Sequence, residues 1–486
     1  MPERLCLREV GFTMRNVRTR MPFRYGVATL TSVPILHVRA EVELAGGSRA
    51  EGLSADILPP KWFDKDPAKS YEENVDDLLF SARQAARAFA EASREPRPVF
   101  DIWRDGYAES LRAGDRRGLD HLTASHGSTL MERALIDAVG QARGRSYHQL
   151  LTDPANPLGL DLGAILPVLA GTPPPAAVAP RPSESIAVRH TVGLADPIRD
   201  DDVPAGEALD DGLPQSLEAY VAAQGLRWLK VKVGGDLEAD LERLTAIARL
   251  LDEGPGAGRY AVSLDGNEQY TELDGFAALL ARLERDLPAF HDAIAYVEQP
   301  LERSVALDEE QAAGIAAVSA RKPMIIDESD GDLDSFERAV EIGYRGVSTK
   351  NCKGLFKALA NAALARRLSG ERGVPFLITA EDLMNLPVVP LHQDLAHVAA
   401  LGLDHAERNG HHYVRGLDHL SPPERERVLG EHEGLYRRSG ESGFLHVAEG
   451  AIDVRSLQRC PGLGAGSAFD PGAMVPLEDW RFESLR

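Results

Sequence analysis

Charged side chains end five successive apolar segments in the second half of the chain. The segments are LRWLKVKV, YAVSLDG, AIAYVEQP, KPMIIDES and YRGVSTK, and the charged residues are Lys230 with Lys232, Asp265, Glu298, Asp327 and Lys350. From Lys232 onwards the steps are 33, 33, 29 and 23 residues, each close to the length of one strand–helix unit. Because a buried charge is costly unless it is paired or binds a metal, this ordered set indicates chemistry rather than packing.

Three members of the set are carboxylates that would meet at one edge of a sheet or barrel. If Asp265, Glu298 and Asp327 converge, they repel one another and raise one another's pKa values. A hard divalent cation removes this repulsion, and carboxylate oxygens suit Mg²⁺, with Mn²⁺ as the alternative ion. The ends of these segments carry no Cys or His, which disfavours zinc. A single acid at a strand end is usually only solvated, but the ordered set predicts a metal site.

Two lysines, Lys230 and Lys232, stand two residues apart on one predicted strand, so both side chains point to the same face. Ammonium groups at close range, or a metal nearby, lower each other's pKa, and the neutral amine that results is a usable general base. Lys350 comes four strands later and would approach a ligand from the opposite side of a barrel. A base on each face is the arrangement that racemisation or epimerisation needs.

Apolar segments and helical patterns alternate from about residue 186, from IAVRHTVG to PFLITAE and LAHVAALGL as the last candidate strands. Alternation at this spacing predicts parallel strands joined by helices. Seven or eight such units predict a closed (β/α) barrel, in which catalytic side chains stand at the C-terminal ends of the strands. An open doubly wound sheet is the alternative, but no Gly-rich phosphate loop follows the first strand.

The chain divides into four parts by composition and periodicity. Residues 1–155 begin with strand-like alternation in ILHVRAEVEL and continue with helical patterns, which predicts a small α+β domain. Residues 156–185 are rich in Pro, Ala and Gly and form a predicted linker or long loop. The barrel is predicted over 186–405, and the less regular residues 406–486 are expected to pack back on the first domain.

The overall composition is that of a soluble globular protein. Its 486 residues include 75 acidic and 54 basic side chains, and the net charge of −21 argues against nucleic acid or an anionic membrane as partner. Three distant cysteines give no disulfide framework, and the charged N-terminus MPERLCLREV is unlike a signal peptide. No segment approaches the roughly 20 consecutive apolar residues of a membrane span. We expect a cytoplasmic protein that binds a small molecule.

In their order along the chain, K-x-K, LDGNEQY, VEQPL, IIDES and STKNCKG resemble the mandelate-racemase and muconate-lactonizing branch of the enolase superfamily. Outside the barrel, MPFRYG (21–26) resembles the mobile loop of that family, MERALIDA (131–138) its helix before the barrel, and PGLG (461–464) the segment that closes the chain. The resemblance implies a modified TIM barrel of (β/α)7β type. It also implies an α+β capping domain completed by the C-terminal segment, and a homo-oligomer.

The resemblance implies roles for individual residues in binding and turning over a small-molecule carboxylate. The implied roles are magnesium ligand for Asp265, Glu298 and Asp327, general base for Lys232, carboxylate-holding group for Lys230, and second acid/base for Lys350. Asn267, Glu381 and Glu407 are candidate substrate-binding residues. For the two glutamates, a solvated position is the alternative.

The reaction that the resemblance implies is removal of the proton α to a carboxylate, through an enediolate. Lysines on both faces favour a racemase, epimerase or cycloisomerase, and an acid-sugar dehydratase is the alternative. A non-catalytic metal-binding barrel is the alternative of another class, but all three lysines are retained. The Asp-x-Asp of many dipeptide epimerases is missing at 404–406, and ITAEDLMN lacks the histidine of mandelate racemase. The sequence does not name the substrate.

Overall fold

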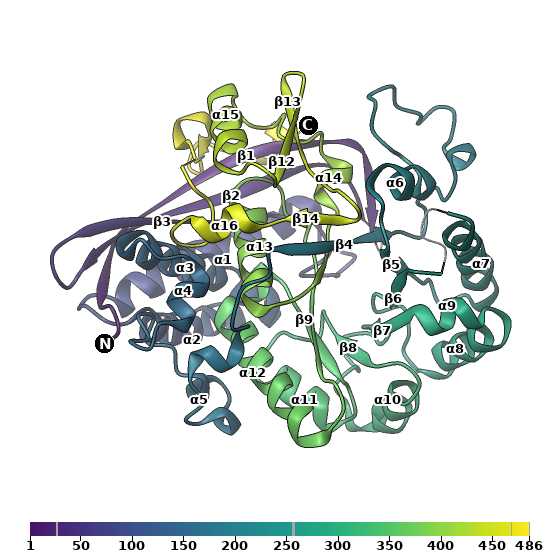
Figure 1. Ribbon diagram of the computed structural model, residues 1–486. Coiled ribbons are helices and arrows are strands. Elements are labelled where there is room, and N and C mark those ends of the chain that lie inside the picture. Colours follow the sequence, from purple (N-terminus) through teal and green to yellow (C-terminus); the bar gives the residue numbers. More distant parts are fainter. Residues whose placement is uncertain (26–27, 255–257, 468, 486) are drawn as a thin grey trace.

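The computed structural model describes residues 1–25, 28–254, 258–467 and 469–485. A long antiparallel sheet with helices on one face lies beside a barrel of strands and helices (Figure 1). Gly26, the last residue of the MPFRYG motif, lies outside the described residues, whereas the rest of that motif belongs to the first strand. The predicted combination of a (β/α) barrel with an α+β domain is confirmed.

The sheet beside the barrel has the strand order β15-β1-β2-β3. Its N-terminal strands and the helices that follow are β1 (Leu5–Tyr25), β2 (Ala28–Leu44), β3 (Arg49–Ile57), α1 (Tyr71–Ala92), α2 (Val99–Arg117), α3 (His121–Arg143) and α4 (Tyr147–Thr152). Helix α1 begins with a capping box, because the Ser70 hydroxyl accepts from the Glu73 N–H and the Glu73 carboxylate accepts from the Ser70 N–H. We call residues 1–155 the capping region.

Helix α3 connects the capping sheet to the barrel and to the end of the chain. Arg133 donates to the Ala55 carbonyl on β3 at 3.0 Å and to the Gln393 side chain of the barrel at 3.2 Å. Asp137 accepts from the Leu53 N–H at 2.9 Å and from the Leu463 N–H at 2.7 Å. The MERALIDA and PGLG motifs therefore meet in space, and MERALIDA supports β3.

Glycine at position 52 is required by the close approach of β3 to α3. A Cβ atom there would lie 2.0 Å from the Ala134 carbonyl oxygen and 2.4 Å from the Ala138 nitrogen, both of which are backbone atoms of α3. We expect Gly52→Ala to lower the free energy of unfolding by about 2 kcal/mol or more, because backbone cannot yield as a flexible side chain can. Denaturant unfolding followed by circular dichroism measures the change.

The matched control is Gly370→Ala in the barrel helix α12 (Leu355–Arg372), where an added Cβ meets nothing within 4 Å. This substitution should leave stability unchanged or raise it by up to about 1 kcal/mol, since alanine favours a helix over glycine. Equal effects of the two substitutions would contradict the proposed contact between β3 and α3.

Within the described residues, eight parallel strands close into a barrel by the pairing of β11 with β4. The strands are β4 (Ser185–Val192), β5 (Trp228–Lys232), β6 (Ala261–Asp265), β7 (Ile294–Glu298), β8 (Met324–Ile326), β9 (Gly346–Thr349), β10 (Leu377–Ala380) and β11 (His405–Glu407). The helices between them are α6 (Leu217–Gln224), α7 (Leu237–Glu253), α8 (Asp274–Asp286), α9 (Pro288–Ala293), α10 (Ala312–Ser319), α11 (Ser335–Glu341), α12 and α13 (Val389–Leu401). The arrangement is the predicted (β/α)7β barrel.

Short helical turns fill the loops around these elements. Before the barrel lie α5 (Leu162–Ile165), η1 (Pro167–Leu169) and η2 (Pro174–Ala177), and within it η3 (Asp200–Asp202), η4 (Glu309–Gln311) and η5 (Asn351–Lys353).

Helix α7 shows why the barrel helices form. Asp236 caps its first turn, and Leu241, Leu244 and Ala248 recur at helical spacing on its buried face.

The last strand predicted from the sequence is wrong. Most of LAHVAALGL lies in α13, and the eighth strand is β11, which follows it. Every residue of α13 is buried, because the helix packs between the barrel and strand β3 of the capping sheet. A helix buried on all sides lacks the polar face that reveals helical periodicity, and a short apolar stretch of this kind resembles a strand.

The residues after the barrel return to both sheets. They form α14 (Gly410–Tyr413), α15 (Pro422–Glu431), β12 (Tyr436–Ser439), β13 (Ser442–Leu445), β14 (Ala451–Asp453), α16 (Arg455–Arg459), η6 (Pro471–Ala473), β15 (Val475–Pro476) and η7 (Phe482–Leu485). Strand β14 pairs antiparallel with β4, and β15 pairs antiparallel with β1. In Figure 1 this yellow segment lies over the capping sheet, close to the purple strands.

Candidate active site

A cavity of about 460 Å³ lies between the C-terminal ends of the barrel strands and the capping region. The predicted site residues that line it are Lys230, Lys232, Asn267, Asp327, Lys350 and Glu407. Asp265, Glu298 and Glu381 are fully or almost fully buried and do not line the cavity. The structure therefore brings the predicted chemical groups to one place, with three of the acids beneath the surface of the cavity.

Strand register places the first acids beside the lysine pair. Lys232 is the register partner of Asp265, and Asp265 is the register partner of Glu298 on the next strand. These residues therefore end neighbouring parallel strands at one level. Asp327 follows β8, one strand further round the barrel.

The Lys230 ammonium is surrounded by four carboxylates. Its distances are 3.0 Å to Asp265, 2.7 Å to Glu298, 2.8 Å to Glu381 and 3.4 Å to Glu407. Burial alone would lower the pKa of Lys230, but these carboxylates reverse the effect and hold its pKa well above the usual value. The predicted lowering of this pKa is wrong, because the acids outweigh the neighbouring lysine. In this conformation the carboxylates around Lys230 thus favour its charged form.

Asp327 binds two ammonium groups on the other side of the cavity. Lys350 lies 2.7 Å from one carboxylate oxygen and Lys353 lies 2.8 Å from the other. Burial opposes ionisation of Asp327, but Lys350 and Lys353 hold its pKa well below the usual range. Asp327 in turn raises the pKa of Lys350 against the effect of that lysine's own burial. The Lys350 ammonium also stands 4.3 Å from the centre of the Trp62 ring, in a cation–π contact.

Lys232 is the most accessible of the three predicted catalytic lysines. Its side chain is 17% exposed, against 2% for Lys230 and 4% for Lys350, and its ammonium lies 2.5 Å from Asp265. It stands on the second barrel strand and Lys350 follows the sixth, so the two amines enter the cavity from opposite sides of the barrel. A ligand between them would present opposite faces to the two lysines.

A comparison with known protein families identifies the family to which the barrel belongs. Residues 213–432 match the family described as enolase C-terminal domain-like. The barrel belongs to the enolase superfamily. The match runs from the loop before α6 to the end of α15, and so includes every predicted catalytic lysine and metal-binding acid.

Solved structures of similar fold span nearly the whole chain. An enolase from Bradyrhizobium complexed with magnesium and mandelic acid has a TM-score of 0.59 at 16% identity, covering 98% of this chain and 100% of that one. A muconate lactonizing enzyme from Pseudomonas fluorescens complexed with muconolactone has 0.58 at 17%, covering 96% and 98%. A dipeptide epimerase from Enterococcus faecalis complexed with Mg and L-Leu-L-Tyr has 0.58 at 15%, covering 94% and 99%. They show that the enolase-superfamily barrel and the capping region occur together in known folds.

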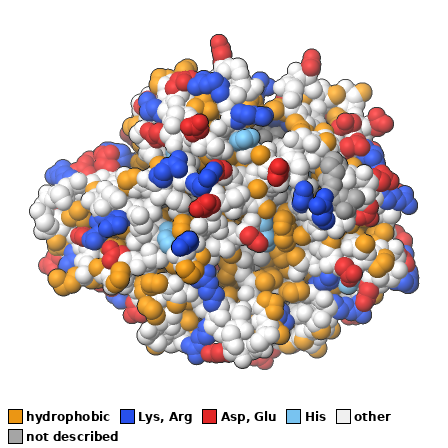
Figure 2. All heavy atoms as spheres, in the orientation of Figure 1, with side chains coloured by type: hydrophobic (Ala, Val, Ile, Leu, Met, Phe, Trp, Pro, Cys, Tyr) orange, Lys and Arg blue, Asp and Glu red, His pale blue; other side chains and the backbone are white. Residues whose placement is uncertain are grey.

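No curated protein matches the sequence of this chain. None of its described helices combines the length and apolarity needed to cross a membrane. On the face drawn in Figure 2, acidic and basic side chains are interspersed rather than gathered into a patch of one sign.

The enolase-superfamily barrel implies a metal, and the acids that would hold it bind lysines in this conformation. Among the described residues, no three Asp, Glu, His or Cys side chains are placed to chelate one ion. The donor chemistry nevertheless fits, because Glu298 Oε2 is buried and has no hydrogen-bond partner. Burial and repulsion by Asp265 and Glu381 hold the pKa of Glu298 well above the usual value, which a cation would relieve. The chemistry of these acids thus suits a metal ion. To bind it, Asp265, Glu298 and Asp327 must give up the lysines that they contact in this conformation.

The candidate substrate-binding residues occupy different depths. Asn267 lines the cavity and donates to the Glu328 carboxylate at 3.0 Å. Glu407 also lines it and accepts from the Thr191 hydroxyl at 2.5 Å. Glu381 is fully buried and lies behind Lys230, where it binds Lys230 and Arg189. Contact with substrate does not fit this position of Glu381, and its role there is to hold Lys230.

Sequence reasoning missed two residues that position the groups of this site, Arg189 and Lys353, and it interpreted a third, Gln299, as structural. Arg189 on β4 is fully buried and pairs with Glu381. Lys353 binds Asp327 as described above. Gln299 accepts from the Asp327 N–H at 2.8 Å and donates to the Ser329 hydroxyl at 2.7 Å. A charged side chain inside the apolar segment IAVRHTVG was the available signal for Arg189, because an interior arginine must find an acid.

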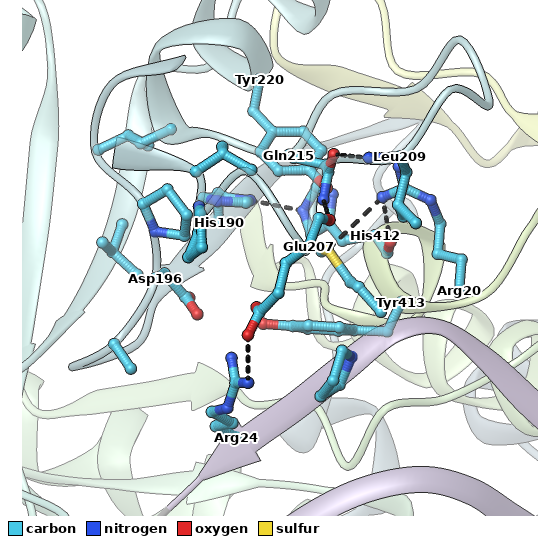
Figure 3. A pocket seen from close by; sticks show the side chains of 18 of the residues that line it. Arg20, Arg24, His190, Asp196, Glu207, Leu209, Gln215, Tyr220, His412 and Tyr413 are labelled. Atoms are coloured by element: carbon cyan, nitrogen blue, oxygen red, sulfur yellow. Dashed lines mark hydrogen bonds and ion pairs between the residues drawn. The ribbon is translucent and has the colours of Figure 1, made fainter. Parts of the chain in front are cut away.

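A second cavity of about 250 Å³ adjoins the first and shares Arg24, Asp196 and Tyr413 with its lining (Figure 3). Polar side chains around it bind one another, as Arg24 does with Glu207 at 3.3 Å and His190 with His412 at 2.5 Å. Through the contact of Arg24 with Glu207, the tip of β1 is held against the loop that follows β4. The second cavity therefore lies at one edge of the site in the enolase-superfamily barrel.

Proposed function

We propose that the protein is a magnesium-dependent enzyme that removes the proton α to a substrate carboxylate and acts as a racemase, epimerase or cycloisomerase. The ion would be held by Asp265, Glu298 and Asp327. The mandelate, muconolactone and dipeptide complexes of similar fold support carboxylate chemistry as the class of reaction. Their low sequence identity leaves the substrate of this chain to be found by experiment.

The observation that carries the proposal is the placement of two lysines on opposite sides of one cavity. Lys232 comes from β5 and Lys350 from the end of β9, and both line the cavity above buried acids. A binding protein without turnover has no need for amines on both sides of its ligand. A two-base arrangement lets one amine remove a proton from one face while the other delivers a proton to the opposite face.

The roles of the side chains follow from their surroundings. Lys232, the most accessible amine, acts as general base on one face, and the Lys350 ammonium acts as general acid on the other. Lys230 stays positively charged and stabilises negative charge that develops on the substrate carboxylate as the enediolate forms. Glu381 and Arg189 keep Lys230 in place. A bound Mg²⁺ would act as a Lewis acid on the carboxylate.

Proton exchange in heavy water tests the proposal. With Mg²⁺ present, the protein should exchange the α-proton of both enantiomers of a suitable carboxylic acid for deuterium, as followed by NMR. Chelation of the metal with EDTA should stop the exchange. Exchange that continues unchanged after chelation, or an absence of exchange across a broad set of carboxylic acids, would count against the proposal.

A further inference from the structure

The Lys350 ammonium lies over the aromatic ring of Trp62 in the main cavity, the one of about 460 Å³. Trp62 belongs to the segment between β3 and α1, its side chain is buried, and it lines the cavity together with Lys350. The ring centre is 4.3 Å from the ammonium nitrogen. At this range the negative face of an indole ring attracts an ammonium group, most strongly where water is excluded. The contact therefore joins a side chain of the capping region to one of the two lysines proposed to transfer protons.

The barrel holds Trp62 in place through its backbone. Arg303, in the loop after β7, donates to the Trp62 carbonyl at 3.1 Å and to the Phe63 carbonyl at 2.9 Å. The Arg303 guanidinium is itself fixed by the Glu268 carboxylate, at 2.7 Å and 3.0 Å. The Phe63 ring packs edge-on against the Trp62 ring, with the ring centres 4.8 Å apart. Because both its backbone and its ring are held, Trp62 can define where the Lys350 ammonium stands.

The contact with Trp62 matters because Lys350 has few other partners. Among the described residues, the hydrogen bonds and ion pairs of the Lys350 ammonium are confined to Asp327. Lys353 also binds the Asp327 carboxylate, but it donates in addition to the Asp327 backbone carbonyl and to the Ser348 hydroxyl, both at 2.7 Å. If the Asp327 carboxylate binds a metal ion, Lys353 therefore retains two other partners, whereas Lys350 retains the ring of Trp62.

The other lysine of the proposed pair is held differently. In the part of the chain that the structure describes, Lys232 pairs with Asp265 and takes part in no cation–π contact. Trp62 is thus placed to act on one of the two amines, and so on one face of a ligand between them. A side chain that merely enclosed the ligand would have no reason to act through one lysine.

We propose that Trp62 is a positioning residue for Lys350, and that its ring holds the Lys350 ammonium at one face of the substrate. This inference rests on the proposed function, because it takes Lys350 as the group that transfers a proton on that face. An aromatic ring suits this task, since it attracts the ammonium without competing as a base for its proton. A displacement of about 1 Å from a productive geometry can cost about 100-fold in rate, so even a weak contact of this kind can control catalysis.

Exchange of the α-proton in heavy water, measured by NMR for each enantiomer of the carboxylic acid that the wild-type protein exchanges fastest, tests the inference. Trp62→Leu keeps an apolar side chain but removes the ring. We expect kcat to fall about tenfold or more for the enantiomer that Lys350→Ala impairs most, and less than about threefold for the other. KM should change little for either enantiomer, because the ring acts through Lys350. Trp62→Phe, which restores a ring, should recover most of the lost rate.

The matched control is Phe23→Leu, which removes another ring from the lining of the same cavity, one that stacks on Tyr413 with the ring centres 4.2 Å apart. This variant should not single out the enantiomer that depends on Lys350. Equal losses of kcat for both enantiomers in folded Trp62→Leu, or no recovery of the rate in Trp62→Phe, would overturn the inference.

A fluorinated ring separates the electrostatic contact from the shape of the side chain. Tetrafluorotryptophan incorporated at position 62 keeps the indole framework but withdraws electron density from its face, so it weakens the attraction for an ammonium group. It should reproduce the loss for one enantiomer without unfolding the protein, and it decides the question if Trp62→Leu does not fold. Undiminished exchange of both enantiomers in the fluorinated protein would contradict the inference.

Thermal unfolding tests the contact without any turnover. Fluorination at position 62 should lower the midpoint of unfolding in the wild-type background and leave it unchanged in Lys350→Met, because the ammonium group is gone from that variant. A wild-type protein that exchanges no carboxylic acid but shows this difference would lose the proposed function and keep the contact between Trp62 and Lys350. Equal shifts of the midpoint in both backgrounds would overturn the inference even if exchange occurs.

Discussion

Replacing Lys232 with alanine should reduce α-proton exchange by about 1000-fold or more for one enantiomer of the substrate, because the amine that removes its proton is gone. Lys350→Ala should have its largest effect on the opposite enantiomer. The expectation follows from the entry of the two side chains into one cavity from opposite sides of the barrel. Rates for both enantiomers, measured by NMR in heavy water for each variant, give the comparison.

Two measurements keep this result interpretable. Lys322→Ala, which changes a lysine outside the cavity whose ammonium donates to the Asp292 carbonyl at 3.5 Å, should retain wild-type exchange. Circular dichroism should show that Lys232→Ala is folded, since its side chain is partly exposed. Wild-type rates for both enantiomers in folded Lys232→Ala would remove Lys232 from the mechanism. Equal losses for both enantiomers in each variant would contradict the assignment of one lysine to each face.

Magnesium should bind the wild-type protein and raise the midpoint of its thermal unfolding, and Glu298→Gln should lose this response. An ion present at 100 times its Kd adds about 2.7 kcal/mol to the stability of a protein that binds it only when folded. The buried, unpartnered Oε2 atom of Glu298 is the part of the site that a cation would satisfy. Glutamine keeps an oxygen that can accept from Lys230 but carries no charge. Thermal scans and calorimetric titrations with MgCl₂ measure the effect without any need for substrate.

The control for this prediction is Glu272→Gln, which removes the charge of an exposed glutamate in the loop before α8. It should retain the full response to MgCl₂. A wild-type protein that shows no heat of binding and no thermal shift would overturn the proposed metal site, whatever the outcome of the exchange experiments. A response retained in Glu298→Gln would exclude Glu298 as a necessary ligand.

Sequence reasoning succeeded where a charged residue interrupts an apolar strand at a regular interval. The spacing of Lys232, Asp265 and Glu298 predicted that they end neighbouring strands, and strand register confirms it. Such spacing is visible because each strand–helix unit has a similar length. The eighth strand was missed because α13 is buried on every side and shows no polar face.

The electrostatic state of the site could not be read from spacing alone. Two lysines on one strand suggested mutual repulsion, but Lys230 lies among four carboxylates. Two of these, Glu381 directly after β10 and Glu407 on β11, come from the last strands of the barrel in sequence order. The sequence identified Glu381 as a candidate site residue. Its burial, however, depends on its ion pair with Arg189, which lies nearly 200 residues earlier in the chain. The sign of a pKa shift depends on all charges near a group, and these meet only when the barrel closes.

The hydrogen bonds of Asp137 link the PGLG segment (461–464) to the side of the main cavity that the capping region forms. The strand that Asp137 holds through Leu53 leads directly to Ile57 and Trp62, and the other oxygen of this carboxylate holds Leu463. A Cβ atom on Gly462 would lie 2.0 Å from that oxygen. A substitution at Gly462 can therefore alter which ligands the main cavity accepts without changing any residue that lines it.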